Sequence, residues 1–325
     1  MLRTACLLVR SRALFLVVTG CLAVAACGNS GKQGAHRLET LLKPAGSGES
    51  TSLFPDEYRP TGLERHALVL PTTFGKRTGD LDQMIRRRAI RALVIINPIG
   101  FFYISGRPQG FHYEALQEFE NFANQKRKTG AVPFHVVFLP MRPDQLEAAL
   151  TKGYGDLIAE EVVITPEREQ RVTFSVPVQR HVSQIVVTGT ALANVTSLDS
   201  LGGTPIYVNP LTTYYDNLKK LSELRQQAGK PPLNIRSADK HLFDDDLIQM
   251  VNANLIQATV TLGNRADLWA QVLPNVRAHP ELAITSEDEV AWVMRKNTPQ
   301  LKQLVDEFLK DHAEGTAFGN VLLRR

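Results

Sequence analysis

Two groups of polar residues in this sequence have the chemistry to bind a small charged ligand. The first group combines Glu160 and Glu161 with Arg168, the last residue of the segment Ile164-Thr-Pro-Glu-Arg168. A planar guanidinium donates two parallel hydrogen bonds to a carboxylate. Arg168 therefore either binds a ligand carboxylate or pairs with a nearby acid such as Glu161, and both interpretations stay open.

The second group is Asn209, Thr212 and Thr213, which lie where a predicted strand gives way to a predicted helix. Backbone N–H groups and the helix dipole favour anions at such a helix start. Threonine is also a common N-cap residue. Thr212 and Thr213 therefore serve either ligand binding or plain helix capping.

Aromatic residues follow an earlier predicted strand. Phe102 and Tyr103, with Phe101 before them, present ring faces that can stack on a sugar or another ring. The same rings can instead pack in the hydrophobic core, so the sequence leaves both roles open.

Motifs for catalysis and for metal binding are missing from the sequence. It has no Gly-x-Ser-x-Gly segment, and its eight histidines form no i, i+4 pair. Glu160 and Glu161 would point to opposite faces of a strand, so they cannot act together on one substrate atom. We therefore expect no metal, no cofactor and a protein that binds without catalysing a reaction.

The N-terminus has the features of a bacterial lipoprotein signal. Three arginines precede an apolar run over residues 13–26, which is short for a membrane span of about 20 residues but suits a signal peptide. The segment Val24-Ala-Ala-Cys27 resembles a lipobox, in which Cys27 is lipidated and becomes the mature N-terminus. The alternative is an ordinary secretory signal cut just before Cys27.

Cysteine usage agrees with lipidation. Cys6, Cys21 and Cys27 are the three cysteines, so removal of residues 1–26 would leave Cys27 alone. A disulfide within the mature chain and a Cys–His metal site are then excluded. Gly28 replaces the aspartate that retains lipoproteins in the inner membrane of many Gram-negative bacteria, so this resemblance implies delivery to the outer membrane, facing the periplasm.

The net charge gives no sign of a nucleic-acid partner. It is +4, and three of the positive charges lie in the expected signal, which leaves about +1. Two short basic runs lie at predicted helix ends, Arg86-Arg-Arg88 and Lys126-Arg-Lys128, and we interpret them as solvent-exposed surface. Residues 27–78 are rich in Gly, Ser, Pro and charge, and we expect them to form a flexible tether after Cys27.

Beyond the tether, short apolar runs alternate with amphipathic segments. The pattern is βαβαβ, followed by a second series of the same kind, which favours parallel sheets with helices on both faces. Strands are predicted at 91–97, 134–139, 156–159, 184–188, 205–209, 233–236, 257–262 and 290–294. Helices are predicted at 114–128, 143–152, 213–228 and 243–255, with a helical turn through Trp269 and a last helix from 298. Two α/β halves imply a ligand cleft between them.

Four motifs in this part of the chain resemble those of the family 3 bacterial solute-binding proteins. They are Gly110-Phe-His-Tyr-Glu114, Gly155-Asp156, Ile164-Thr-Pro-Glu-Arg168 and Phe174-Ser-Val-Pro177. The resemblance implies an α/β fold of the periplasmic-binding-protein type II, with two α/β lobes and a cleft between them. Lobe 1 is expected at 79–185 plus 286–325, and lobe 2 at 186–285.

A closer resemblance is to the solute-binding-like half of the membrane-bound lytic murein transglycosylase F family. Six segments carry it: 79–85, 185–189, 237–239, 250–253, 269–272 and 319–323. In that family a lysozyme-like domain follows and cuts the cell wall, whereas the sequence here ends at Arg325. The resemblance implies the binding half without the catalytic half, unless the gene continues past this residue.

The solute-binding family also implies roles for individual residues. Its Thr-x-x-Arg arginine binds the ligand carboxylate, and Arg168 holds that position. Glu160 and Glu161 stand where the family usually has small hydroxyl or amide residues, and the aspartate for the ligand amino group falls near Leu262-Gly263, where no carboxylate is present. An incomplete amino-acid clamp makes a larger or cationic ligand, such as a peptide or amino sugar fragment, the expectation.

Two classes of function remain open from the sequence. The first is a lipid-anchored binding protein that captures a small amino-acid-like solute for an ABC importer or a sensor. The second is a non-catalytic regulatory module that binds a muropeptide fragment or a cell-wall enzyme. The expected partners are therefore a small-molecule ligand and the membrane, and not a nucleic acid.

The lipobox gives a first testable prediction. Replacing Cys27 with Ala removes the thiol that would carry the lipid, so the protein should leave the membrane fraction and lose its acylation. Fractionation and metabolic labelling with a fatty acid measure both effects. Membrane partitioning that is unchanged in Cys27→Ala would contradict the lipoprotein assignment.

Overall fold

A computed structural model of the chain describes residues 75–129, 132–192, 194–201 and 203–312. The expected signal peptide, the lipidation site Cys27 and nearly all of the expected tether lie outside these ranges. Within them, no helix is both long and apolar enough to cross a membrane.

The described residues form a mixed nine-stranded sheet and a separate two-stranded hairpin. The sheet order is β4-β1-β5-β11-β7-β10-β8-β9, and β6 pairs with β11. The sheet strands are β1 (Ala89–Val94), β4 (His135–Pro140), β5 (Leu157–Val163), β6 (Val172–Phe174), β7 (Gln179–Gly189), β8 (Ile206–Val208), β9 (Ile235–Ser237), β10 (Ala258–Leu262) and β11 (Val276–Arg295). The hairpin strands are β2 (Phe102–Ile104) and β3 (Arg107–Gln109).

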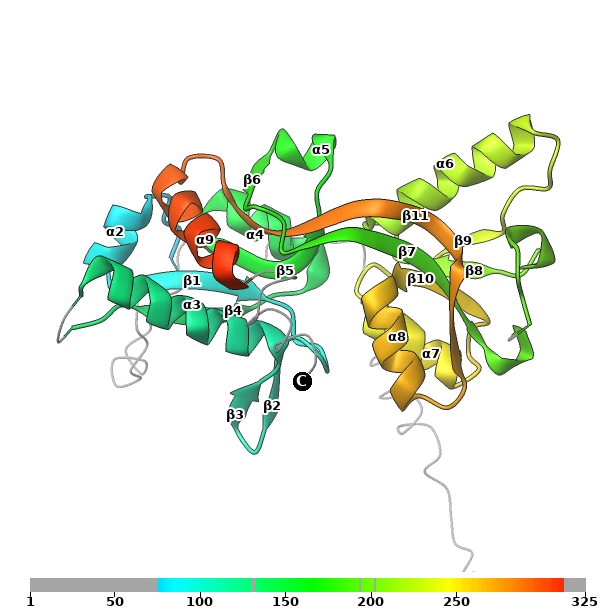
Figure 1. Cartoon of the computed structure of the whole chain (residues 1–325), viewed down its shortest axis with the longest axis horizontal. Helices are drawn as coiled ribbons and strands as arrows, with labels where there is room; N and C mark the ends of the chain where they lie inside the picture. Colours follow the sequence, from blue (N-terminus) through cyan, green and yellow to red (C-terminus); the bar gives the residue numbers. More distant parts are fainter. Residues whose placement is uncertain (1–74, 130–131, 193, 202, 313–325) are drawn as a thin grey trace, which may run out of the picture. The chain divides into compact units, whose positions relative to one another are not determined.

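The sheet contains two parallel groups of strands, as the βαβ pattern predicts. β1 pairs in parallel with β4 and β5, and β8 pairs in parallel with β9 and β10. β7 and β11 depart from this parallel arrangement, because they pair antiparallel to each other and to their neighbours. These two long strands run together between the two groups (Figure 1).

Helices flank both strand groups. The helices are α2 (Leu81–Arg86), α3 (Phe111–Arg127), α4 (Leu146–Lys152), α5 (Pro166–Glu169), α6 (Thr213–Gln227), α7 (Asp244–Asn252), α8 (Gly263–Val272) and α9 (Pro299–His312). Short 3₁₀ turns occur at Pro143–Gln145, Thr190–Leu192 and Leu198–Leu201. Each predicted helix is present, with ends that differ by a few residues.

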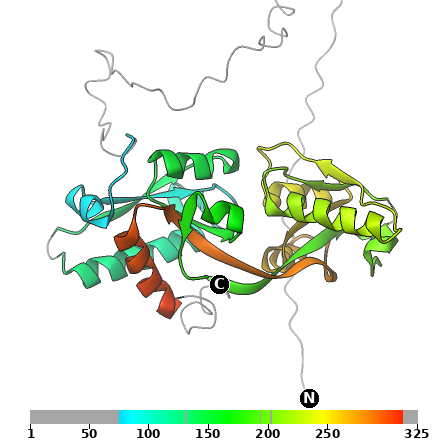
Figure 2. The same cartoon turned by 90° about the horizontal axis from the view of Figure 1, so that it is seen from above.

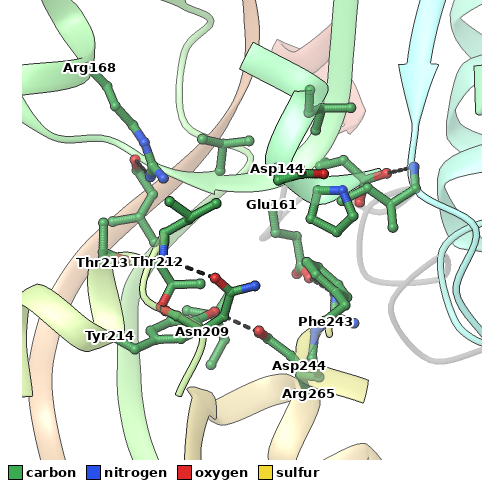
Figure 3. Close-up of a pocket in the computed structure, with 18 residues that line it drawn as sticks. Asp144, Glu161, Arg168, Asn209, Thr212, Thr213, Tyr214, Phe243, Asp244 and Arg265 are labelled. Carbon is green, nitrogen blue, oxygen red and sulfur yellow. Dashed lines mark hydrogen bonds and ion pairs between the residues drawn. The ribbon is translucent and has the colours of Figure 1, made fainter. Parts of the chain in front are cut away.

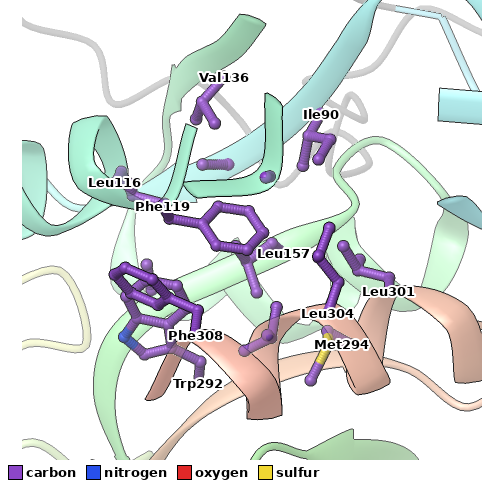
Figure 4. Packing of buried hydrophobic residues seen from close by; sticks show 14 of the residues in the cluster. Ile90, Leu116, Phe119, Val136, Leu157, Trp292, Met294, Leu301, Leu304 and Phe308 are labelled. Atoms are coloured by element: carbon purple, nitrogen blue, oxygen red, sulfur yellow. The ribbon is translucent and has the colours of Figure 1, made fainter. Parts of the chain in front are cut away.

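The largest hydrophobic core lies between β1, β5, β11 and the helices α3 and α9, which lie side by side (Figures 1 and 2). Phe119 of α3 meets Phe308 of α9 and Trp292 of β11 edge to face, with ring centroids 5.4 and 5.8 Å apart (Figure 4). All three side chains are buried. Each buried aromatic removes a large apolar area from water, so this cluster joins the C-terminal helix to the first strand group.

Two further cores surround the second strand group. One packs Leu218 of α6 against Ile206 and Val260 of the sheet. The other packs Val251 of α7 and Trp269 of α8 against the opposite set of strand residues. Because successive strand residues point to opposite faces, the two cores cover the two faces of this part of the sheet.

A buried charge cluster lies behind β1. The Asp156 carboxylate is fully buried and accepts hydrogen bonds from the guanidinium groups of Arg87, Arg91 and Arg295. Burial opposes ionisation of Asp156, but the arginines outweigh it and lower the pKa of its carboxyl group. Asp156 therefore stays ionised and holds α2, β1 and β11 together.

Asp156→Asn should destabilise the fold strongly, because it leaves the buried guanidinium groups without their carboxylate. Removal of one partner from a buried ion pair costs about 3–5 kcal/mol. Urea unfolding at pH 7, followed by circular dichroism, measures the free energy of unfolding. The matched control Asp82→Asn removes only an exposed pair with Arg86 and should change stability by less than about 1 kcal/mol. Equal losses in the two variants would contradict the role given to Asp156.

Candidate functional site

A pocket of about 140 Å³ lies where β5 and α5 meet the N-terminal ends of α6, α7 and α8 (Figure 3). Its charged lining residues are Asp144, Glu160, Glu161, Arg168, Asp244 and Arg265. An adjacent pocket of about 550 Å³ shares four of its wall residues, which are Arg168, Leu211, Thr212 and Thr213. The two pockets therefore adjoin each other at the start of α6.

Arg168 is positioned by the short helix α5, whose N-cap Thr165 accepts a hydrogen bond from the Arg168 backbone. Its Nη1 donates to the Val163 carbonyl at 3.1 Å, and its Nε lies 3.8 Å from Glu147 Oε2. The suggested pairing of Arg168 with Glu161 is therefore wrong. Burial lowers the pKa of Arg168, but a guanidinium keeps its charge in proteins. The side chain extends toward Thr213 in Figure 3.

Glu161 is bound by residues that the sequence did not single out. Its carboxylate accepts hydrogen bonds from Asn264 at 2.7 Å and from Arg265 Nη2 at 3.2 Å. Arg265 also donates from Nη1 to both oxygens of Asp245, at 3.0 and 2.8 Å. Its guanidinium lies over the Phe243 ring, 5.2 Å from the centroid. Burial opposes the charge on Arg265, but the carboxylates of Asp245 and Glu161 raise its pKa.

Asp244, at the start of α7, supplies a carboxylate to the pocket lining. Its Oδ2 accepts hydrogen bonds from the Tyr214 hydroxyl and the Thr261 hydroxyl, both at 2.9 Å. Desolvation is the largest influence and raises the pKa of Asp244 to about 6, although the Arg265 charge opposes it. This residue was not identified from the sequence, although the acidic run at 244–246, at a predicted helix start, is a signal that could have identified it.

Glu160 forms the back wall of the pocket. Its Oε1 accepts a hydrogen bond from the Ile95 backbone at 2.9 Å, and its Oε2 lies 3.1 Å from His112 Nδ1. Burial opposes protonation of His112, but Glu160 outweighs it and raises the pKa of the imidazole. A Cβ atom at Gly100 would lie only 2.3 Å from this Nδ1. The imidazole is therefore held tightly between Gly100 and Glu160.

Asn209, Thr212 and Thr213 all line the pocket, but they are bound differently. Asn209 is buried, and its side-chain amide donates to the Lys240 and Leu242 carbonyls. These bonds connect the loop before α6 to the loop before α7. Thr212 is the N-cap of α6, yet its hydroxyl donates to the Asn209 carbonyl and caps no N–H group. The capping role suggested for the Thr212 side chain is therefore wrong.

Residues 94–318 match the family model described as bacterial extracellular solute-binding proteins, family 3. The chain belongs to this family. The match covers most of the described residues and includes all of the pocket lining.

Solved structures confirm the expected type II periplasmic-binding fold. An amino acid ABC transporter substrate-binding protein of Streptococcus pneumoniae, bound to L-arginine, superposes with a TM-score of 0.62 at 16% identity, over 75% of this chain and 96% of that one. An ancestral amino acid-binding protein, described as a precursor of cyclohexadienyl dehydratase, gives 0.58 at 21% identity, over 75% and 97%. At these identities the likeness shows the fold alone.

Curated relatives confirm the second resemblance. Membrane-bound lytic murein transglycosylase F of Desulfosudis oleivorans is 25% identical over 229 residues, which is 70% of this chain and 46% of the relative. The protein of that name from Salmonella typhi is 25% identical over 226 residues, or 68% and 43%. The family 3 chain described here thus spans just under half the length of these relatives.

The aromatic residues Phe102 and Tyr103 do not line the pocket of this family 3 protein. They lie on the β2–β3 hairpin, where Tyr103 is 53% exposed. Tyr103 packs edge to face on Phe101, which is fully buried and stacks on Phe138 with centroids 5.2 Å apart. The core role is correct for Phe101, and stacking on a ligand in this pocket is wrong for the other two.

A chain of hydrogen bonds elsewhere in the second half has the composition of a catalytic triad. Thr188 Oγ1 lies 2.7 Å from His279 Nε2, and His279 Nδ1 lies 2.9 Å from Glu281 Oε1. Thr188 is fully buried, so no substrate can reach its hydroxyl. These three residues therefore connect β7 to β11.

In the described ranges, no cluster of three or more His, Cys, Asp or Glu residues has the geometry to hold a metal ion.

The raised pKa of Asp244 predicts a stability effect with a definite sign. The folded state holds the proton more tightly than the unfolded chain, so ionisation of Asp244 costs stability above about pH 6, and this cost disappears as the pH falls from 6 toward 4. Relative to Asp244→Asn, the wild type should gain about 2 kcal/mol between pH 7 and pH 4.5, because the full gain of about 3 kcal/mol is reached only below about pH 3.

Urea unfolding of the wild type and the variant at both pH values measures this difference. Asp267→Asn, which changes an exposed carboxylate on α8, is the matched control and should show no comparable change. A difference between wild type and Asp244→Asn that does not vary with pH would show that Asp244 is not a buried titrating group.

Proposed function

We propose that this family 3 protein is a lipid-anchored, extracytoplasmic binding protein that captures a small ligand between two lobes for transport or sensing. Lobe 1 would comprise 79–185 plus 286–325, and lobe 2 would comprise 186–285. β7 and β11 would connect them and absorb the rotation of a hinge. The observation that carries the proposal is the pocket that joins Arg168, on α5, to the N-terminus of α6.

This end of the pocket suits an anionic group of the ligand. Among the described residues, the Arg168 guanidinium donates to the Val163 carbonyl and lies 3.8 Å from Glu147. Its remaining N–H groups can therefore donate to a ligand carboxylate. The first N–H groups of α6 receive no side-chain cap, and they favour negative charge at the same place. Glu161 is held by Arg265 and Asn264, so the expected competition with a ligand carboxylate at Arg168 is removed.

The other end of the pocket suits a cation. Asp144 and Asp244 line it with carboxylates. Asp144 pairs with Arg142, whereas the Asp244 carboxylate accepts hydrogen bonds from the uncharged Tyr214 and Thr261 hydroxyl groups. A ligand with both a carboxylate and an amino group complements this arrangement. The solved neighbours bound to L-arginine support an amino-acid-like ligand. The adjacent 550 Å³ volume also leaves room for a peptide or a muropeptide fragment.

Arg168→Gln should weaken binding of such a ligand by about 10- to 100-fold. A charged hydrogen bond contributes about 1.5–3 kcal/mol, and each 1.4 kcal/mol is a factor of ten. Isothermal titration calorimetry with single amino acids, dipeptides and muropeptides measures the affinity. The control Arg180→Gln removes an exposed arginine that pairs with Glu289 and lines neither pocket. Amino-acid binding that Arg168→Gln leaves unchanged would contradict the pocket assignment.

A second candidate function follows from the names of the curated relatives. The chain would then be a non-catalytic regulatory module that binds muropeptide-like ligands or a cell-wall enzyme. The same titrations separate the two candidates, because a muropeptide bound more tightly than any amino acid favours the cell-wall role. Release of anhydro-muropeptides from peptidoglycan by this chain would contradict both binding-only proposals.

A further inference from the structure

A third pocket, of about 470 Å³, lies at the C-terminal end of α2 and shares no residue with the ligand pocket. We call it the arginine pocket. Its lining residues are Arg77, Thr78, Gln83, Arg86 and Arg87. The described lining thus offers three guanidinium groups, a hydroxyl and an amide, and contains no carboxylate.

The charge beneath the arginine pocket is not balanced. Arg87 donates to Asp156, and the same carboxylate also pairs with Arg91 at 3.0 Å and Arg295 at 3.1 Å. One carboxylate therefore pairs with three guanidinium groups, and these four side chains carry a net charge of +2. Burial lowers the pKa of Arg295, and the charges of Arg91 and Arg87 contribute to the same effect. Because this positively charged cluster lies next to the arginine pocket, the electrostatic potential in the pocket is positive.

Arg77 adds a fixed donor to the wall. Its backbone N–H donates to the Gly153 carbonyl at 2.8 Å, and its own carbonyl accepts from Arg91 Nη2 at 3.1 Å. Its side-chain Nε is buried and has no hydrogen-bond partner among the described residues. Arg86 is exposed and pairs only with Asp82 on the same helix turn, an interaction of at most about 1 kcal/mol.

We propose that the arginine pocket binds an anionic phosphate group, carried by a phospholipid headgroup or by a soluble phosphate. Guanidinium groups recognise phosphate oxygens through paired hydrogen bonds. Thr78 and Gln83 add neutral donors on the same wall. A phosphate held by these guanidinium groups offsets the excess positive charge around Asp156. The basic run at 86–88 therefore includes a binding wall and is not only solvated surface.

The test uses the whole chain purified in a neutral detergent. Microscale thermophoresis at constant ionic strength would titrate inorganic phosphate, and separately detergent-solubilised phosphatidylglycerol with phosphatidylcholine as the lipid without net charge. We expect saturable binding that weakens at least tenfold in the double variant Arg77→Gln/Arg86→Gln. This variant keeps Arg87, and hence the pairs of Asp156, so the fold should be retained; its circular dichroism spectrum checks this.

The control is Arg88→Gln, which removes one charge just beyond the pocket lining, whereas the double variant removes two from the lining itself. It should change the affinity by less than about twofold, because Arg88 does not line the pocket. Tighter binding of phosphatidylglycerol identifies a membrane headgroup as the source, and tighter binding of inorganic phosphate identifies a soluble one. The proposal is overturned if neither anion binds saturably, or if the double variant binds as the wild type does.

Discussion

A buried guanidinium needs carboxylate partners, and the way Arg265 meets this need determines the rest of the ligand pocket. Charge without a partner in the interior costs several kcal/mol. Arg265 finds Asp245 on α7 and Glu161 on β5, so one side chain connects the two strand groups at the pocket. It thereby holds Glu161 away from Arg168. In the proposed binding mode, the guanidinium of Arg168 can then meet a ligand carboxylate, and this separation of charges gives the pocket its two ends.

The sequence predicted the local elements well, because their signals lie within short stretches of chain. The apolar runs of β1, β4 and β10 and the amphipathic pattern of α9 each identify an element directly. β11 was predicted only over 290–294, because its first half is polar and half-exposed and becomes a strand through pairing with β7. The β2–β3 hairpin was missed for another reason, since each of its strands has only three residues and is too short to show an alternating pattern.

The candidate site was predicted in part. Glu161, Arg168 and Thr213 were found from motif position and do line the pocket. Arg265 and Asp244 were missed, because Arg265 lies 104 residues from Glu161 along the chain and no local pattern marks such a pairing. Phe102 and Tyr103 were wrongly placed, since the direction of a hairpin depends on the packing of Phe101 beneath it.

The contact between Gly100 and His112 has a consequence for how this pocket can change. A side chain at position 100 would displace the imidazole, and the imidazole holds Glu160 in the back wall. If the proposed pocket binds the ligand, a substitution that touches no ligand atom would therefore alter ligand preference. Specificity would then depend partly on residues behind the binding surface, through a glycine that leaves room for the His112–Glu160 pair.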